Sequence, residues 1–199
     1  MLISAVRFEV DPVLDILKKH QIPHAYHECG VGPLNAARKS LQLREEVRNK
    51  NVLYLGSAGT FSNFDKPHLC KVNQVFWLPT GERMGLAKHM EGLHRPISLV
   101  DSQLFDLPAK KVLTSTSVSL VNDISLDGLP NREQLIENME AYSLLEGLTS
   151  SIKNLDVILG VTNAVGSEGS KQWSENFKNV AKITADYLES KLDIVEALI

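Results

Sequence analysis

Hydrophobic and polar positions along the chain predict strands and helices in alternation. Apolar runs that predict strands occur at residues 2–8, 24–29, 52–55, 71–78 and 156–162. The run at 52–55 is uninterrupted, which is typical of a strand covered on both faces. Residues 111–120 alternate weakly and predict one or two further strands.

Segments with apolar residues at helical spacing separate these runs. They cover residues 13–20, 34–47, 138–151 and 172–198. Asp11 and Pro12 suit an N-cap and a first-turn proline. Strands that alternate with helices predict an α/β fold around a largely parallel sheet, and the length suits one domain over residues 1–199. In such sheets ligands bind beyond the carboxyl ends of the strands.

Composition and charge exclude some classes of function but do not change the predicted fold. Charged residues make up 23% of the chain and the net charge is −3, whereas a general nucleic-acid binder is usually basic. No apolar stretch approaches the ~18 residues of a membrane span, and the N-terminal segment lacks the basic lead of a signal peptide. We therefore expect a cytoplasmic protein that binds neither nucleic acid nor membrane. Cys29 and Cys70 are expected to be buried free thiols.

Two glycine-containing segments follow predicted strands. Residues 56–59, Gly-Ser-Ala-Gly, form either a loop that lets a ligand approach the backbone or a structural turn. Gly30-Val31-Gly32 precedes a helix and favours close packing of that helix on a strand. The histidines lack the spacing of metal ligands, so we expect no metal site and no cofactor.

Three other side chains each allow two interpretations. Glu140, near the start of a predicted helix, is either a partner of the helix dipole or an acceptor for two sugar hydroxyls. Asn163 follows a buried strand and either caps a loop or binds a purine at N7–H and a 6-oxo group. Trp173 is interpreted as a core residue that anchors its helix rather than as a stacking platform.

Taken in order, these segments resemble the nucleoside phosphorylase/nucleosidase superfamily. The matching segments are residues 5–9, 30–37, 52–59, 137–140 and 161–163. Within the superfamily, Asn138-Met139-Glu140, then residues 162–166 and Trp173, look most like futalosine hydrolases, whose substrate carries hypoxanthine. The resemblance implies a three-layer α/β fold, with a mixed central sheet flanked by helices, and hydrolysis of a purine nucleoside at its N-glycosidic bond.

The resemblance also implies catalytic roles for two residues. Glu9 would activate the attacking water, and Asn163 would bind the purine edge. Methylthioadenosine/S-adenosylhomocysteine nucleosidases, which act on adenine, have Asp where this chain has Asn163.

The remaining implied roles concern substrate binding. Glu140 would hold the ribose 2′- and 3′-hydroxyls and Met139 would pack against the sugar, while Ser57 and Gly59 would line the sugar and water site. Ser119 and Leu120 belong to the segment 117–121, which would form the wall against the base, although it contains no aromatic residue. The implied partners are a small-molecule nucleoside and a second copy of the chain in a homodimer.

The chain departs from this pattern in ways that keep other functions open. Leu159 stands where relatives usually have Arg, and residues 167–169 read Ser-Glu-Gly where futalosine hydrolases tend to have Arg-Asp. The chain is also shorter than most relatives, and we expect the contraction between residues 100 and 131. The alternatives are an adenine-specific methylthioadenosine/S-adenosylhomocysteine nucleosidase, a purine nucleoside phosphorylase and a non-catalytic nucleoside binder.

Overall fold

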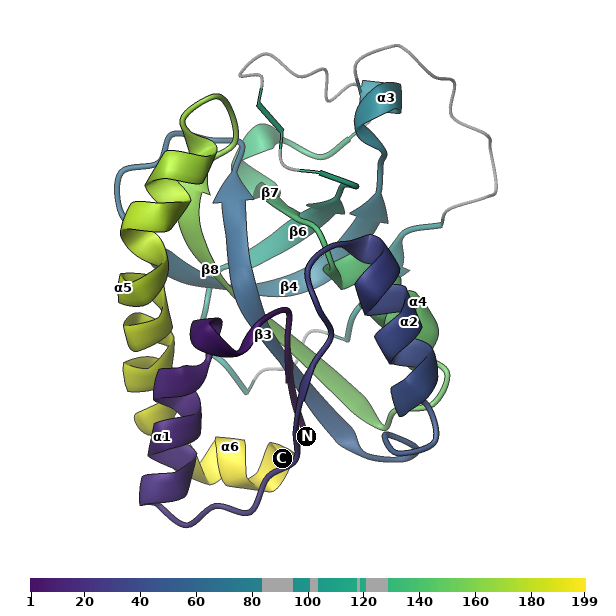
Figure 1. Cartoon of the computed structure of the whole chain (residues 1–199), viewed down its shortest axis with the longest axis vertical. Helices are drawn as coiled ribbons and strands as arrows, with labels where there is room; N and C mark the ends of the chain where they lie inside the picture. The colour runs from purple at the N-terminus through teal and green to yellow at the C-terminus, as the bar shows by residue number, and fades with distance from the viewer. Residues whose placement is uncertain (84–94, 101–103, 118, 121–128) are drawn as a thin grey trace.

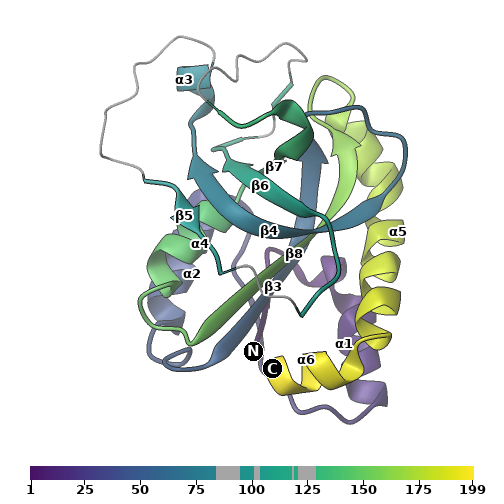
Figure 2. The same cartoon turned by 180° about the vertical axis from the view of Figure 1, so that it is seen from behind.

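A mixed β-sheet with helices on both faces forms the centre of the protein (Figures 1 and 2). This computed structural model describes residues 1–83, 95–100, 104–117, 119–120 and 129–199. The strands are β1 (Leu2–Ser4), β2 (Tyr26–Glu28), β3 (Asn51–Thr60), β4 (His68–Trp77), β5 (Ile97–Ser98), β6 (Ala109–Thr114), β7 (Leu135–Asn138) and β8 (Asn154–Ala164). The α-helices are α1 (Asp11–Lys19), α2 (Pro33–Leu43), α3 (Thr80–Arg83), α4 (Ala141–Leu148), α5 (Gly169–Glu189) and α6 (Leu192–Leu198), and the 3-10 helices are η1 (Arg7–Glu9) and η2 (Arg132–Gln134).

The strand order is β2-β1-β3-β7-β6-β4-β5, and β8 pairs with both β3 and β4. Strands β1, β2, β3 and β8 are parallel neighbours, as are β4, β6 and β7. Antiparallel pairing of β8 with β4 and of β7 with β3 joins the two sets. The mixed sheet flanked by helices is therefore confirmed. The sheet is less parallel than the alternation of strands and helices predicts, because antiparallel pairs join its two parallel sets.

Alternate side chains of β3 enter two separate hydrophobic clusters. Val52 and Tyr54 pack on the side of α2 and α4. Leu53 and Leu55 pack on the side of α1, α5 and α6. Both faces of the strand are thus buried, which explains its continuous apolar sequence. Each fully buried leucine contributes about 1.5–3 kcal/mol through removal of apolar surface from water. These clusters hold the three layers together (Figure 1).

Two segments have a different secondary structure from the one predicted. The predicted strand over residues 2–8 ends at Ser4, and the chain then turns through η1, which carries Glu9. Residues 56–59, predicted as a loop or turn, lie inside β3, which pairs with β8 as far as Thr60 with one shift in register between Ala58 and Gly59. Gly59, directly after this shift, leaves space for the Asn163 side chain.

Two predicted helices and the predicted strand over 111–120 have different boundaries in the structure. The helix predicted from residue 138 begins at Ala141, because residues 135–138 pair with β3 and β6 as β7. The closing helix over 172–198 begins earlier, at Gly169, and divides into α5 and α6 around Ser190. The strand β6 ends at Thr114, so Ser119 and Leu120 lie outside it. Residues 101–103, 118 and 121–128 of the expected contraction lie outside the described residues.

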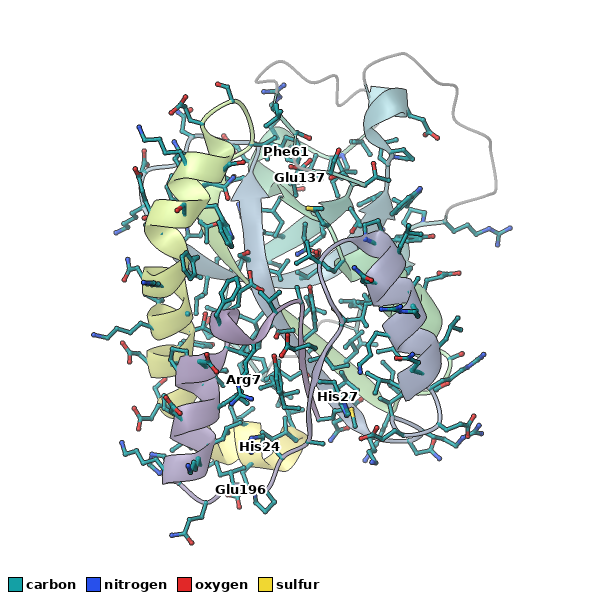
Figure 3. The ribbon with its side chains drawn as sticks, in the orientation of Figure 1. Arg7, His24, His27, Phe61, Glu137 and Glu196 are labelled. Atoms are coloured by element: carbon teal, nitrogen blue, oxygen red, sulfur yellow. The ribbon has the colours of Figure 1, made fainter. Side chains whose placement is uncertain are left out.

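Both cysteines agree with the expectation from the sequence. Cys29 and Cys70 are free and buried, and burial raises the pKa of each thiol to about 12. His24 bonds with the Ile22 carbonyl and His27 with Glu46, away from each other (Figure 3). None of the helices in the described part of the chain has the length and hydropathy of a bilayer span.

Candidate active site

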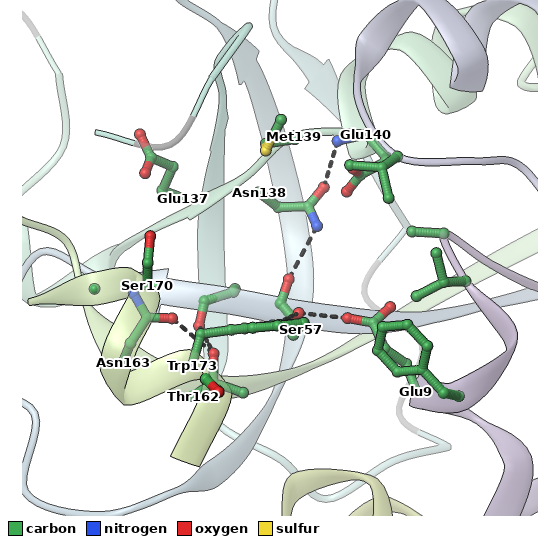
Figure 4. Close-up of a pocket in the computed structure, with 18 residues that line it drawn as sticks. Glu9, Ser57, Glu137, Asn138, Met139, Glu140, Thr162, Asn163, Ser170 and Trp173 are labelled. Carbon is green, nitrogen blue, oxygen red and sulfur yellow. Dashed lines mark hydrogen bonds between the residues drawn. The ribbon is translucent and has the colours of Figure 1, made fainter. Parts of the chain in front are cut away.

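A pocket of about 480 Å³ opens at the carboxyl ends of β3, β7 and β8, a volume typical of small-molecule sites (Figure 4). Its walls also include η1, the loop before α2, the turn from β7 into α4 and the first turns of α5. Six of the eight candidate residues from the sequence line it: Glu9, Ser57, Gly59, Met139, Glu140 and Asn163.

Ser119 and Leu120 do not line the pocket. The backbone N–H and hydroxyl of Ser119 both donate to the Glu137 carboxylate, which itself lines the pocket. Leu120 is 63% exposed. Ser119 therefore lies behind Glu137 and Leu120 faces solvent, so these two residues do not form the expected wall, while residues 118 and 121 lie outside the described residues and the role of the segment stays a prediction.

Glu9 lies at the end of η1, and its two carboxyl oxygens have different surroundings. The Ser57 hydroxyl donates to Oε1 at 2.5 Å, while Oε2 is buried and has no hydrogen-bond partner among the described residues. Burial raises the pKa of Glu9 to about 7, with a further increase from the Glu140 charge, against the lowering effect of the Ser57 hydrogen bond. A carboxyl that titrates near neutrality is suited to general-base catalysis.

Trp173 lies beside Ser57, and sequence reasoning missed this role. The Trp173 indole N–H donates to the Ser57 hydroxyl oxygen at 3.1 Å, and the ring lines the pocket instead of serving only as core. The signal was present in the sequence, because Trp173 falls one turn into the helix that follows Asn163. The first turns of a helix that follows a strand lie close to the carboxyl end of that strand.

Glu140 occupies the position before the first residue of α4, and its carboxyl group bonds with the loop before α2. The Gly32 N–H donates to Glu140 Oε1 at 2.8 Å. Gly32 has φ +86°, a left-handed conformation that favours glycine, so this loop presents a backbone donor where other residues would be strained. Burial raises the pKa of Glu140, partly offset by the Gly32 hydrogen bond.

Asn138 ties this acidic turn to the central strand. Its Oδ1 accepts the N–H groups of Glu140 and Ala141, at 2.9 and 2.7 Å. Its Nδ2 donates to the Ser57 carbonyl at 3.0 Å. One buried amide therefore sets both the start of α4 and the position of Glu140 relative to Ser57. Asn138 belonged to the Asn-Met-Glu motif, but the sequence alone did not indicate this contact.

The side chain of Asn163 is oriented by its neighbours. The Thr162 hydroxyl donates to Oδ1 at 2.7 Å, and Nδ2 donates to the Ala164 carbonyl at 2.8 Å. The carbonyl requires a donor, which assigns the oxygen and nitrogen of the amide. The amide lies over Gly59, where an added Cβ would stand 2.8 Å from Nδ2. The absence of a side chain at Gly59 therefore leaves the space that the Asn163 amide occupies.

Glu137 was not among the candidate residues, yet it lines the same pocket. Its carboxylate accepts from the Ser115 and Ser119 hydroxyls and is almost completely buried. Glu137 and Asn163 both pair with Gly59, from β7 and β8 respectively. Figure 4 places Glu137 and Asn163 on the side of the pocket away from Glu9. The pocket therefore has two polar ends.

The pocket is acidic. Its described lining contains three carboxyl groups, those of Glu9, Glu137 and Glu140, and no Lys, Arg or His. Arg7 is exposed and pairs with Asp11. Leu159, where the sequence departs from the superfamily pattern that it resembles, is fully buried in the hydrophobic core.

Comparisons with known proteins agree on the fold. No protein-family sequence model matches the chain, and no curated protein matches it in sequence. The chain is structurally similar to a Helicobacter pylori methylthioadenosine/S-adenosylhomocysteine nucleosidase variant with 5′-methylthioadenosine in its active site, with TM-score 0.73, 13% identity and 96% of each chain covered. The chain has the nucleosidase fold.

Other nucleosidases have the same fold. A futalosine hydrolase mutant of Helicobacter pylori matches with TM-score 0.70, 14% identity, and coverage of 96% of this chain and 97% of that chain. The Streptococcus pneumoniae methylthioadenosine/S-adenosylhomocysteine nucleosidase with a transition-state inhibitor matches with TM-score 0.70, 15% identity and 98% of each chain covered. The fold implied by the resemblance is confirmed, and these identities leave the substrate open.

Proposed function

We propose that this protein is an N-glycosyl hydrolase that cleaves a purine nucleoside, with hypoxanthine as the departing base. The observation that carries the proposal is the convergence of Glu9, Glu140 and Asn163 on one pocket in a nucleosidase fold. Solved proteins of this fold include both futalosine hydrolase and methylthioadenosine/S-adenosylhomocysteine nucleosidases, so the base must be argued from the pocket itself.

Bond cleavage at the sugar requires a base for water and a fixed ribose. Glu9 Oε2, which has no partner among the described residues, accepts a proton as the water oxygen attacks C1′. The C1′–N9 bond breaks and its electron pair leaves with the purine. Glu140 accepts hydrogen bonds from the ribose 2′- and 3′-hydroxyls and holds C1′ in line with the water. Met139 packs against the sugar.

Asn163 stabilises the departing base. Because Thr162 and Ala164 each use one hydrogen-bonding position of the amide, one lone pair on Oδ1 and one hydrogen on Nδ2 remain. These match N7–H and O6 of hypoxanthine, with the N7 proton taken from solvent. The 6-amino group of adenine would instead meet the remaining N–H of Asn163. Such a mismatch costs roughly 1–3 kcal/mol, or about tenfold to a hundredfold in preference.

Water is the proposed attacking group rather than phosphate. Sites that bind phosphate usually gather several Arg or Lys side chains. The described lining of this pocket has carboxyl groups and no cationic side chain, which disfavours a phosphate dianion. This acidic character supports a hydrolase over a purine nucleoside phosphorylase.

The experiment that tests the function is chromatography of inosine, futalosine and methylthioadenosine after incubation with the protein, with and without phosphate. We expect release of hypoxanthine from inosine or futalosine at equal rates in both conditions. A strict phosphate requirement would identify a phosphorylase, and preferential release of adenine would identify the adenine-specific alternative. Binding of nucleoside without any base release would support a non-catalytic binder, which the substitution at Leu159 keeps as the second candidate.

A homodimer is proposed on separate grounds. Val31, which lines the pocket, is 54% exposed, and Leu34 and Leu41 on α2 are 85% and 66% exposed. A second copy that covers these side chains would remove exposed apolar surface at the pocket mouth. Light scattering after size-exclusion chromatography measures the mass directly, and a monomer at micromolar concentration would contradict the proposal. The cytoplasmic location and the single-domain organisation stay predictions.

A further inference from the structure

A chain of hydrogen bonds runs from α5 to the carboxyl group of Glu9. The Trp173 indole N–H donates to Ser57 Oγ at 3.1 Å, and the Ser57 hydroxyl donates to Glu9 Oε1 at 2.5 Å. These three residues come from α5, β3 and η1, so the chain connects three elements across one wall of the pocket (Figure 4).

The chemistry of the indole makes this chain directional. An indole N–H is a donor only, whereas a hydroxyl carries one proton and two lone pairs. The Ser57 oxygen must therefore accept from Trp173, and this orients its single proton toward Glu9. A serine without the indole could rotate and donate elsewhere, for example to water in the pocket.

The tryptophan ring is itself held in place. It stacks on Phe177 with ring centroids 5.0 Å apart and meets Phe8 edge-on at 6.1 Å. Phe8 precedes Glu9 in η1 and also contacts Phe177 at 5.3 Å between centroids. The aromatic contacts therefore couple the segment that carries Glu9 to α5, independently of the hydrogen bonds.

We propose that Trp173 is a positioning residue for hydrolysis: its N–H commits the Ser57 proton to Glu9 Oε1, which stabilises the carboxylate and leaves Oε2 for the attacking water. This inference rests on the proposed function only for its catalytic consequence. Trp173 takes no part in proton transfer, because its N–H stays a donor throughout.

Other charged and titratable groups near Glu9 do not replace this contact. The Glu140 charge raises the pKa of Glu9 through the electrostatic field and not by a hydrogen bond, and the Glu9 charge in turn raises the pKa values of the buried Tyr54 and Cys29. On α5, Lys178 lies over the Phe177 ring at 5.9 Å from its centroid. On η1, Arg7 pairs with Asp11 at the surface.

Nuclear magnetic resonance of the indole N–H groups tests the hydrogen-bond chain without any substrate. The chain has two tryptophans, so two indole signals are expected, and Trp77→Phe removes one and assigns Trp173. Trp77 packs against Tyr142 and lies outside the pocket lining. In the Trp77→Phe protein we expect the Trp173 signal to move between pH 5 and 9 with a midpoint near 7, the value for Glu9.

Two further substitutions in that background decide the result. Glu9→Gln should abolish the titration, and Ser57→Ala should weaken it and speed exchange of the indole proton with solvent. Glu175→Gln, at an exposed position of α5, is the matched control and should leave the titration unchanged. A Trp173 signal that titrates equally with Gln at position 9, or does not titrate at all, would overturn the inference whatever the protein's activity.

The catalytic consequence is tested through a pH profile. Trp173→Phe keeps an aromatic ring and removes the N–H, so we expect the acid limb of kcat/KM to move upward by about one pH unit, with Trp77→Phe unchanged. A loss that is equal at every pH would indicate a packing role alone and reject the positioning role. If Trp173→Phe does not fold, the resonance experiment on the other variants still decides whether the hydrogen-bond chain exists.

Discussion

Replacement of Glu9 by Gln should remove activity and at the same time stabilise the protein at alkaline pH. The amide keeps an oxygen that accepts from Ser57, but it cannot become charged. In the folded protein the pKa of Glu9 rises from 4.5 to about 7, mainly because of burial. At about 1.4 kcal/mol per pH unit, the charged form therefore costs the fold roughly 3 kcal/mol.

The direction with pH follows from the raised pKa. The folded protein holds the Glu9 proton more tightly than the unfolded chain does, so this contribution to stability is full below pH 4.5. It is lost as the pH rises through about 7. The Gln variant lacks this loss. Its amide nitrogen, buried where Oε2 has no partner, carries a cost that does not depend on pH.

Urea unfolding at pH 5 and pH 8 measures the effect. The free energy of unfolding of Glu9→Gln, relative to the unsubstituted protein, should increase by about 2–3 kcal/mol between these two pH values. The exposed Glu175→Gln serves as the control and should show no such change. A difference that stays constant between pH 5 and pH 8 would refute the assignment of a buried carboxyl that titrates near neutrality.

Kinetics complete this prediction. Loss of a general base typically lowers kcat by about 10²–10⁴-fold, and we expect Glu9→Gln to fall in that range. In the unsubstituted protein, kcat/KM should decrease below about pH 7 as Glu9 becomes protonated. A variant that is more stable at pH 8 yet inactive would identify Glu9 as a functional group that the fold retains at a cost in stability.

Three further substitutions test the rest of the pocket. Asn163→Asp should shift preference toward adenine nucleosides by about tenfold or more in the ratio of kcat/KM values, and an unchanged ratio would count against a base-edge role. Gly59→Ala would place Cβ 2.8 Å from Asn163 Nδ2; displacement of the amide should lower kcat/KM at least ~10-fold, while circular dichroism stays native-like. Glu140→Gln should lower kcat/KM about 10–100-fold through weaker ribose binding, and it should move the acid limb to lower pH because one charge that raises the pKa of Glu9 is removed. An acid limb that does not move in Glu140→Gln would show that the two carboxyl groups do not interact.

The sequence alone determined the α/β alternation and the composition of the central strands. The uninterrupted apolar run in β3 reflects burial on both faces, which is a local and readable pattern. Sequence order also indicated Glu9, Glu140 and Asn163, because each follows a recognisable segment. The boundaries were less certain: no strand was predicted over β7, and its last residue, Asn138, was assigned to the following helix, because four residues are too few to show a period of two.

Only the tertiary structure decided how these residues meet. Trp173 bonds with Ser57 across 116 positions of sequence, and Asn138 bonds with Ser57 across 81. Such contacts depend on strand register, since a slip of one residue would turn every side chain of a strand to the opposite face. The same register brings Glu137 and Asn163 to either side of Gly59. A local pattern can state which residues a strand contains, but pairing between distant strands determines which of them share a pocket.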